Sequence, residues 1–375
     1  MRDRLDQVIR ALAPIERPPG SAGERRAAEW LAERLGGARL EEHPVHGGFW
    51  KPVGLLSAIA AVGNRPMAAG AALALVDEID CGFYAFRNLL GRGRTAVNVV
   101  AERGDPQAER TLVVMAHHDA AQSGLVFHSG PQRWIGTKFP SVIENNDTAA
   151  PMWWPVVIGA ALVALGGRRL RRVGRVICGL TALLMADIGR HKAVPGANDN
   201  LTGVAALVVL GDLLRERPPS RLRVILLSAG AEETLQEGIR GYAQKHFGDL
   251  PTETTWFLNI DSVGSPELTL LEGEGPFVMR EYTDSFKELV ARAGERVGVR
   301  VRRNMRARTS TDGVVPLRAG YPTATVVSIN EFKSIDNYHW PTDVPDNVNL
   351  GTVERALRLA EAVVRELESS EWIHR

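Results

Sequence analysis

Residues 111–119, TLVVMAHHD, join a run of apolar and β-branched side chains to three ionisable ones. A run that is apolar at almost every position is typical of a strand buried on both faces of a sheet. Because side chains alternate along a strand, His117 and Asp119 are expected on one face and His118 on the other. The stretch therefore predicts a buried strand whose carboxyl end presents an imidazole supported by a carboxylate.

The same strand pattern recurs along the chain and alternates with helical patterns. Further apolar strands are predicted at residues 95–102, 222–230, 255–264 and 322–329. Helical periodicity covers residues 202–215, 234–246, 282–297 and 353–367, and a capping-box pattern at Ser21 and Glu24 begins another helix. Strands that alternate with helices favour an α/β fold with a mostly parallel sheet covered on both faces. Chemistry in such sheets is expected at the carboxyl ends of the strands.

Two apolar regions interrupt this alternation, within residues 49–80 and 125–192. Each contains two apolar segments around a polar turn, GNRP in the first and GGRRLRR in the second, which indicates a helical hairpin. No single segment reaches the roughly 20 apolar residues that a membrane-spanning helix needs. Two alternatives stay open: the hairpins form a hydrophobic cap or a homo-dimer contact, or they insert into a membrane surface.

The bulk composition is that of a globular chain. It has 375 residues, 45% of them hydrophobic, and a net charge of +1, so no overall field favours nucleic acid as a partner. Only Cys81 and Cys178 occur, without the spacing of a disulfide framework or a cysteine metal site. Residues 1–20 lack the apolar core of a secretory signal. We therefore expect a cytoplasmic protein, with membrane association left open by the hairpins.

Ionisable residues stand at several strand ends and in loops. Besides the first group, the candidates are Asp199, Glu232, Glu233, Asp261 and His339. Taken singly, each has an ordinary structural explanation; Asp199, for example, stands where a helix cap is expected. Asp343, four residues after His339, is expected either to orient that histidine or to belong to a turn.

Taken together, two histidines and four carboxylates without cysteine suit a catalytic pair of Zn²⁺, Co²⁺ or Mn²⁺ ions. Adjacent Glu232 and Glu233 can divide the work, one binding metal and the other taking a proton from metal-bound water. An ionised Asp199 at a helix N-terminus can join two cations, with Asn198 and Asn200 fixing its orientation. The residues themselves therefore predict a dinuclear metallohydrolase.

The motifs AHHD, PGANDNLTG, GAEE, NIDSVG and NYHWPTD occur in the order found in the M28 family of zinc metallopeptidases. The chain resembles that family, which includes bacterial leucyl-type aminopeptidases and the related glutaminyl cyclases. The resemblance implies one catalytic domain over residues 1–375, of the zinc-dependent exopeptidase type. Its fold would be a three-layer α/β/α sandwich around a mostly parallel mixed sheet, with the two apolar helical hairpins as insertions.

The resemblance also implies a role for each site residue. His117, Asp199 and Asp261 would bind one zinc, and Asp199, Glu233 and His339 the other. Glu232 would be the general base that deprotonates the water between the metals and later protonates the leaving amine. Asp119 would orient His117, and the substrates would be peptides with a free N-terminus.

The chain departs from the family pattern in two places. TLQEGIRGY, residues 234–242, follows the glutamate pair where the family often has Gly-Leu and a small residue, which points to an altered substrate wall. The segment between Asp119 and Asp199 is unusually long, and we expect it to form a lid over the site. A glutaminyl cyclase and a non-catalytic binding or membrane-scaffold protein are the alternative functions.

Overall fold

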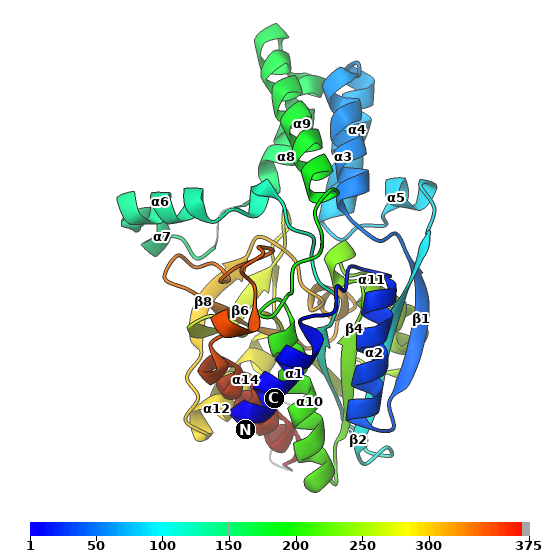
Figure 1. Cartoon of the computed structure of the whole chain (residues 1–375), viewed down its shortest axis with the longest axis vertical. Coiled ribbons are helices and arrows are strands. Elements are labelled where there is room, and N and C mark those ends of the chain that lie inside the picture. The colour runs from blue at the N-terminus through cyan, green and yellow to red at the C-terminus, as the bar shows by residue number, and fades with distance from the viewer. Residues whose placement is uncertain (149–150, 370–375) are drawn as a thin grey trace.

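A nine-stranded mixed sheet forms the centre of the computed structural model, which describes residues 1–148 and 151–369 (Figure 1). Its order is β1-β2-β4-β3-β5-β9-β6-β7, with β8 paired to β6. The strands are β1 Arg39–Val45, β2 Arg94–Gly104, β3 Thr111–His117, β4 Arg223–Ala229, β5 Thr255–Ile260, β6 Glu267–Glu274, β7 Arg280–Glu281, β8 Arg302–Ala307 and β9 Thr323–Ile329. The four central strands β4, β3, β5 and β9 are parallel, whereas β2 and β6 pair with them antiparallel and β1 pairs antiparallel with β2.

Helices cover both faces of this sheet, so the expected α/β/α sandwich is confirmed. One face carries α1 Arg2–Leu12, α2 Ala22–Leu35, α10 Leu201–Glu216, α12 Asp284–Arg296 and α14 Leu350–Glu368. The other face carries α11 Glu237–His246 and α13 Val314–Arg318. Along β3, Leu112 and Val114 enter the first core while Val113 and Met115 enter the second. This alternation is why the strand is apolar at nearly every position.

The five predicted strands are present, and two of the helix predictions needed adjustment. The helix predicted from residue 234 begins at Glu237, because residues 232–236 form a short 3-10 turn, η2 Glu232–Thr234, and two left-handed residues. The N-cap of α10 is Asn200, whose Oδ1 accepts the hydrogen bond of the Gly203 N–H at 3.0 Å. Asp199 is therefore not the capping residue, which was the ordinary structural explanation for it.

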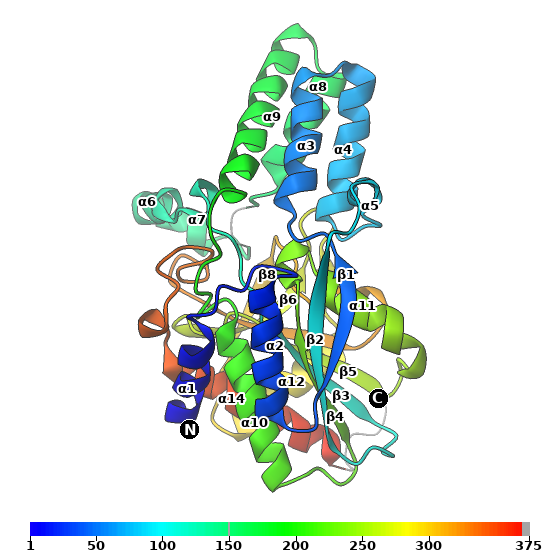
Figure 2. The ribbon, with the colours of Figure 1, turned by 45° about the vertical axis from the view of Figure 1, so that its right-hand side comes forward.

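Both apolar regions form helical hairpins, and the hairpins pack against each other. The helices are α3 Trp50–Val62, α4 Arg65–Ile79, α8 Trp154–Leu165 and α9 Arg168–Ile188. Their shared core includes Val53, Leu75, Val163 and Cys178. The four helices stand together as a bundle beyond one end of the sheet (Figure 2). No helix in the described ranges is long and apolar enough to cross a membrane.

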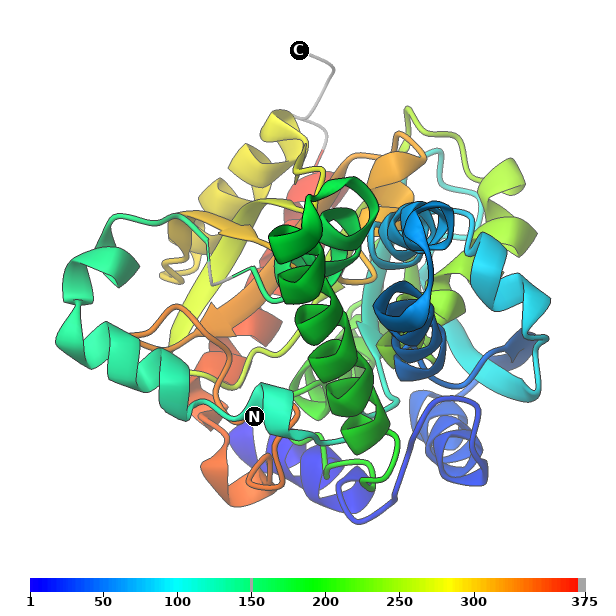
Figure 3. The same ribbon diagram turned by 90° about the horizontal axis from the view of Figure 1, so that it is seen from above.

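Short helices connect these parts of the molecule. They are α5 Ala85–Leu89, η1 Leu125–Phe127, α6 Gly130–Lys138, α7 Pro140–Glu144, η3 Phe247–Asp249 and η4 Pro345–Asn347. Viewed from above, α6 and α7 extend to one side of the bundle (Figure 3). The predicted insertion at residues 125–192 and the predicted domain over 1–375 include residues 149–150 and 370–375, which lie outside the described residues.

Candidate metal centre

The predicted site residues meet at the carboxyl edge of the parallel strands. His117 is the last residue of β3, and Asp261 directly follows β5. Glu232 and Glu233 form η2 after β4, and His339 lies in the loop that follows β9. Asp199 stands two residues before α10. This convergence is what the strand pattern predicts, since parallel strands present their carboxyl ends at one edge.

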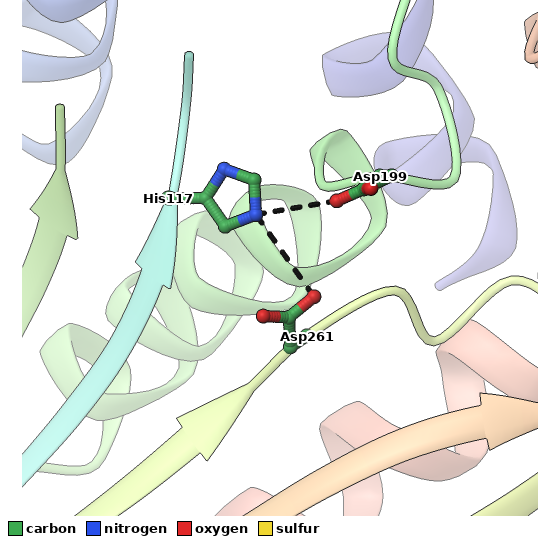
Figure 4. Close-up of side chains that lie close together, drawn as sticks. All are labelled: His117, Asp199 and Asp261. Carbon is green, nitrogen blue, oxygen red and sulfur yellow. Dashed lines mark ion pairs between the residues drawn. The ribbon is translucent and has the colours of Figure 1, made fainter. Parts of the chain in front are cut away.

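The two carboxylate oxygens of Asp199 face two different histidines. Its Oδ1 lies 3.2 Å from Nε2 of His117, and its Oδ2 lies 3.2 Å from Nε2 of His339. Asp261 Oδ1 is 3.9 Å from His117 Nε2 on one side, as Figure 4 shows. Glu233 Oε2 is 3.2 Å from His339 Nε2 on the other side. Asp199 thus stands between two similar clusters.

Each cluster has the chemistry of a metal site. In the first cluster, each residue offers one ligand atom, and these atoms lie within 4.8 Å of one another; its members are His117, Asp199 and Asp261. The same holds for the second cluster, which consists of Asp199, Glu233 and His339. A third group combines His117 with Glu232 and Glu233. Oε1 of Glu233 is buried without a hydrogen-bond partner in the described structure. Imidazole and carboxylate donors with such a free lone pair fit zinc, cobalt or manganese.

The backbone around Asp199 is held from the loop that carries His339. The carboxylate of Asp343 accepts hydrogen bonds from the backbone N–H groups of Asn198, at 2.7 Å, and Asp199, at 3.1 Å. In the described structure the carboxylate of Asp343 bonds to this backbone and not to His339, so the expectation that it orients His339 is not met. Burial raises the pKa of Asp343 to about 7, against the hydrogen bonds that stabilise its charge.

The flanking asparagines join Asp199 to the loop of Asp261. Oδ1 of Asn200 accepts from the Ser262 N–H at 3.0 Å in addition to capping the helix. Oδ1 of Asn198 accepts from the Gly264 N–H at 2.7 Å. The two asparagines thus fix the segments that carry Asp199 and Asp261 relative to each other, and their expected role in orienting the Asp199 side chain stays a prediction.

Asp119 holds the glutamate pair in place. Its Oδ1 accepts from the Glu232 N–H and its Oδ2 from the Glu233 N–H, each at 3.0 Å. The same carboxylate lies 3.4 Å from Nδ1 of His117, outside hydrogen-bond geometry. The Asp119 carboxylate therefore lies between the glutamate pair and His117. Its role in orienting His117 stays a prediction.

The buried groups of the site strongly influence each other's charge. Burial would raise the pKa of Asp199, but hydrogen bonds from His117 and His339 hold it well below its ordinary value. Burial also raises the pKa of Asp261, to about 6. Burial would lower the pKa of His339, but Glu233 and Asp199 raise it to about 10. Burial raises the pKa of Glu232 well above its ordinary value. The site thus concentrates negative charge around two imidazoles.

Sequence reasoning missed Gln236, which contacts Glu232. Its Nε2 donates to Glu232 Oε1 at 2.9 Å and to the Ser310 carbonyl at 3.0 Å. Its Oε1 accepts from Sγ of Cys81, at 3.0 Å, directly after the first hairpin. Leu235 and Gln236 both have positive φ, at 65° and 61°, which non-glycine residues adopt at a cost. The unusual sequence after the glutamate pair was the only signal for this contact.

The segment that follows the first hairpin supports this strained turn. Tyr84 donates from its hydroxyl to the carbonyl of Leu235, and Arg87 donates to the carbonyl of Thr234. Arg87 is fully buried and pairs with Glu78. These residues follow the apolar segment of the hairpin, where nothing in the sequence indicates contact with a distant loop.

Asp312 is a second residue that sequence reasoning missed. Both of its carboxylate oxygens are buried without a hydrogen-bond partner in the described structure. Burial raises its pKa well above the ordinary value, and the nearby carboxylates of Asp119 and Asp261 add to the effect. It lies in the sequence TDGVV, residues 311–315, just before α13, where no strand end marks it.

The second insertion reaches the site through Phe127. Its ring packs edge-on against the imidazole of His339, with centroids 4.4 Å apart, while Tyr338 stacks on the same imidazole at 3.8 Å. Farther along, Trp340 packs against His128. These contacts lie where the expected lid would act, and the lid itself stays a prediction.

Fold and donor set together define the class of zinc-exopeptidase-like α/β proteins. The sequence model of Peptidase family M28 matches residues 182–364, which include every predicted site residue except His117 and Asp119. This match confirms the resemblance to the family and supports a hydrolase. A comparison with curated protein sequences found no match.

Solved structures with the same fold include two aminopeptidases. One is an aminopeptidase from Aneurinibacillus sp. strain AM-1, with 13% identity, a TM-score of 0.57, and coverage of 97% of this chain and 93% of that chain. Another is a zinc aminopeptidase from Bacillus subtilis, with 14% identity, a TM-score of 0.58, and coverage of 98% and 95%. A Bacteroides thetaiotaomicron glutaminyl cyclase bound to N-acetylhistamine has 13% identity, a TM-score of 0.58, and coverage of 97% of both chains. At these identities the likeness establishes the fold.

Proposed function

We propose that the protein is a dinuclear zinc aminopeptidase that removes N-terminal residues from peptides. The observation that carries this proposal is the position of Asp199, with one oxygen 3.2 Å from each of two histidines. His117 and Asp261 would complete one metal site, and Glu233 and His339 the other. A carboxylate shared between two such sets is what a two-metal site requires.

The chain's own residues divide the remaining work. Bound zinc would supply Lewis-acid polarisation of the scissile carbonyl and an activated water. Glu232, fixed by Asp119 at its backbone and by Gln236 at its carboxylate, takes a proton from the attacking water and delivers it to the leaving amine. The carboxylates gathered at the site favour a substrate with a positively charged amino group.

Substitution of Glu232 by glutamine tests the proposal. The amide keeps the shape of the side chain but cannot accept a proton, so kcat for aminoacyl-anilides should fall by roughly 10²–10⁴. Zinc content and the melting temperature should stay near those of the wild type. Glu295→Gln, on the exposed side of α12, is the matched control and should leave kcat unchanged. Wild-type kcat in the Glu232→Gln variant would remove Glu232 from this role.

A glutaminyl cyclase remains the second candidate, because structures of that activity have the same fold at the same TM-score. Cyclisation of an N-terminal glutamine needs no water as a reactant, and one zinc ion would suffice. Assay of glutaminyl peptides beside aminoacyl-anilides separates the two activities. Cyclised product from a protein with a single tightly bound zinc would favour the cyclase. A non-catalytic binding protein is the third candidate, and the retention of all five proposed ligands weighs against it.

A further inference from the structure

The outer surface of the helical bundle is apolar to an unusual degree. Within the four helices the most exposed large apolar side chains are Leu165 at 85%, Val62 at 83%, Leu73 at 75% and Leu183 at 68%. Each of the four helices carries one of them. Along α9, Val173, Val176, Leu180 and Leu183 form one exposed apolar strip. Contiguous exposed apolar surface of this kind marks a binding surface.

The bundle is also strongly basic. Residues 49–76 and 153–186, which include nearly all of its four helices, contain no aspartate or glutamate. The same segments contain seven basic residues: Lys51, Arg65, Arg168, Arg169, Arg171, Arg172 and Arg175. Since the whole chain has a net charge of +1, the rest of it carries six more acidic than basic side chains. Positive charge is thus concentrated on the apolar part of the molecule.

The two hairpin turns lie at the end of the bundle away from the sheet (Figure 2), and the arginines lie in these turns or in the first helical turns that follow them. Arg65 donates to the carbonyl of Gly166 at 2.9 Å, and Arg175 donates to the carbonyl of Gly63 at 3.3 Å. These two bonds tie the turns together. Arg168, Arg169 and Arg172 are exposed beside them and form no ion pair in the described structure. Their charges are available to a partner.

We propose that the bundle docks on an anionic lipid surface. Exposed leucine and valine side chains would enter the boundary between headgroups and acyl chains, while arginines keep their stems in that boundary and reach the phosphates. A flat protein partner would cover one side of the bundle, whereas lipid can cover apolar residues on several helices at once. The absence of acidic residues matches the negative charge of the headgroups. Docking of this kind lies on one face of the membrane and does not need a spanning helix.

The end of the bundle nearest the sheet contacts the segments that carry the metal centre, so docking would also fix the position of the site. Trp50 at the start of α3 donates from Nε1 to Oε1 of Gln122 at 2.7 Å, three residues after Asp119. Cys81, just after α4, contacts Gln236 and through it Glu232. Lipid binding would therefore hold the site near the membrane, separated from it by the length of the bundle, where it would meet the N-termini of peptides that extend from the membrane or are released from it. This last point rests on the proposed function, whereas the docking itself does not.

Vesicle co-sedimentation of the full chain tests the docking. The lipids are phosphatidylcholine alone and phosphatidylcholine mixed with phosphatidylglycerol, and binding should be much stronger to the mixed vesicles. Each basic residue near an anionic surface strengthens binding about fivefold, so Arg168→Gln/Arg169→Gln/Arg172→Gln should weaken it roughly 100-fold. Leu180→Gln/Leu183→Gln should weaken binding to the mixed vesicles by about tenfold or more.

A matched control separates this site from general charge attraction. Arg221→Gln/Arg292→Gln/Arg300→Gln removes three exposed arginines from the body of the protein and should leave vesicle binding within about twofold of the wild type. Circular dichroism melting of every variant verifies its folding without reference to activity. Equal effects of the two triple variants, or no binding of the wild type to anionic vesicles, would overturn the proposal. A dimer in solution that dissociates in the leucine variant, without vesicle binding, would assign the surface to a second copy instead.

Discussion

Asp199 is the residue on which the proposed site depends. It is the one side chain common to both ligand sets, and its two oxygens face different histidines. Its backbone is fixed by Asp343, and its neighbours Asn198 and Asn200 are fixed to the loop of Asp261. Its loss should therefore affect both metal sites, whereas loss of a terminal ligand should affect mainly one.

Metal content measured by mass spectrometry tests this difference. Asp199→Ala should retain almost no zinc after dialysis. His339→Ala should retain about one equivalent, because the ligands of the other metal, His117, Asp199 and Asp261, are all present. Asp284→Ala, whose side chain is 94% exposed, is the control and should keep the wild-type content. Similar zinc loss in the Asp199 and His339 variants would contradict a bridging role.

Gln236 is expected to act by positioning Glu232. Gln236→Leu removes the bond from Nε2 to Glu232 Oε1, and one hydrogen bond to a charged group is worth a factor of roughly ten or more. Steady-state kinetics should show kcat reduced about tenfold with KM little changed. Ser310→Ala is the control, since the bond between Gln236 and Glu232 remains. If the leucine variant kept the wild-type kcat, Gln236 would be a structural residue only.

Most residues of the candidate site could be predicted from the sequence. The seven predicted residues follow strands or precede a helix, and a shared sheet edge is enough to bring them together. Gln236, Asp312 and Arg87 escaped prediction for a common reason. Gln236 contacts Cys81 and Ser310, and Arg87 contacts Thr234, across more than 70 residues of sequence, and no periodic pattern or strand end marks any of the three.

Among the strands, those that are buried on both faces of the sheet could be predicted from the sequence. The central parallel strands are apolar throughout, which a sequence pattern shows directly. β1 alternates exposed and buried positions, and β8, RRNMRA, contains three arginines. Such edge strands have too little apolar character to be distinguished from loops. β1 and β8 were missed for this reason.

The two hairpins were predicted as helices, but their packing depends on glycines at one crossing. A Cβ on Gly174 of α9 would lie 2.6 Å from the carbonyl oxygen of Gly159 in α8. Real Cβ atoms do not approach so closely, so a larger residue must push the helices apart. Gly179, one helix turn and a half further along α9, has nothing within 4 Å of such a Cβ.

This contrast makes Gly174→Ala and Gly179→Ala a matched pair. Overpacking at Gly174 should lower the free energy of unfolding by about 1–3 kcal/mol. Alanine at Gly179 should raise helix stability by about 1 kcal/mol, because glycine is a poor helix former. Thermal melting followed by circular dichroism measures both changes. Equal changes in the two variants would show that α8 and α9 do not cross closely there.

In the molecule as a whole, the sequence did not predict which strands pair with each other or that the two hairpins pack together. The alternating pattern predicted an α/β sandwich, but not the strand order or the position of β8. The hairpins are separated by more than 70 residues, and their union into one bundle depends on complementary surfaces that no local pattern encodes. The packed hairpins form an apolar, basic bundle beside the site. Just after the first hairpin, Cys81 and Tyr84 contact the turn that follows Glu232.

In the proposed site, two metal ions lie on either side of Asp199. Crystal diffraction at the zinc absorption edge, on protein purified with zinc, would locate them. We expect two anomalous peaks about 3.5–4 Å apart, one beside His117 and Asp261 and the other beside His339 and Glu233. A single peak, or peaks that do not contact Asp199, would contradict this arrangement.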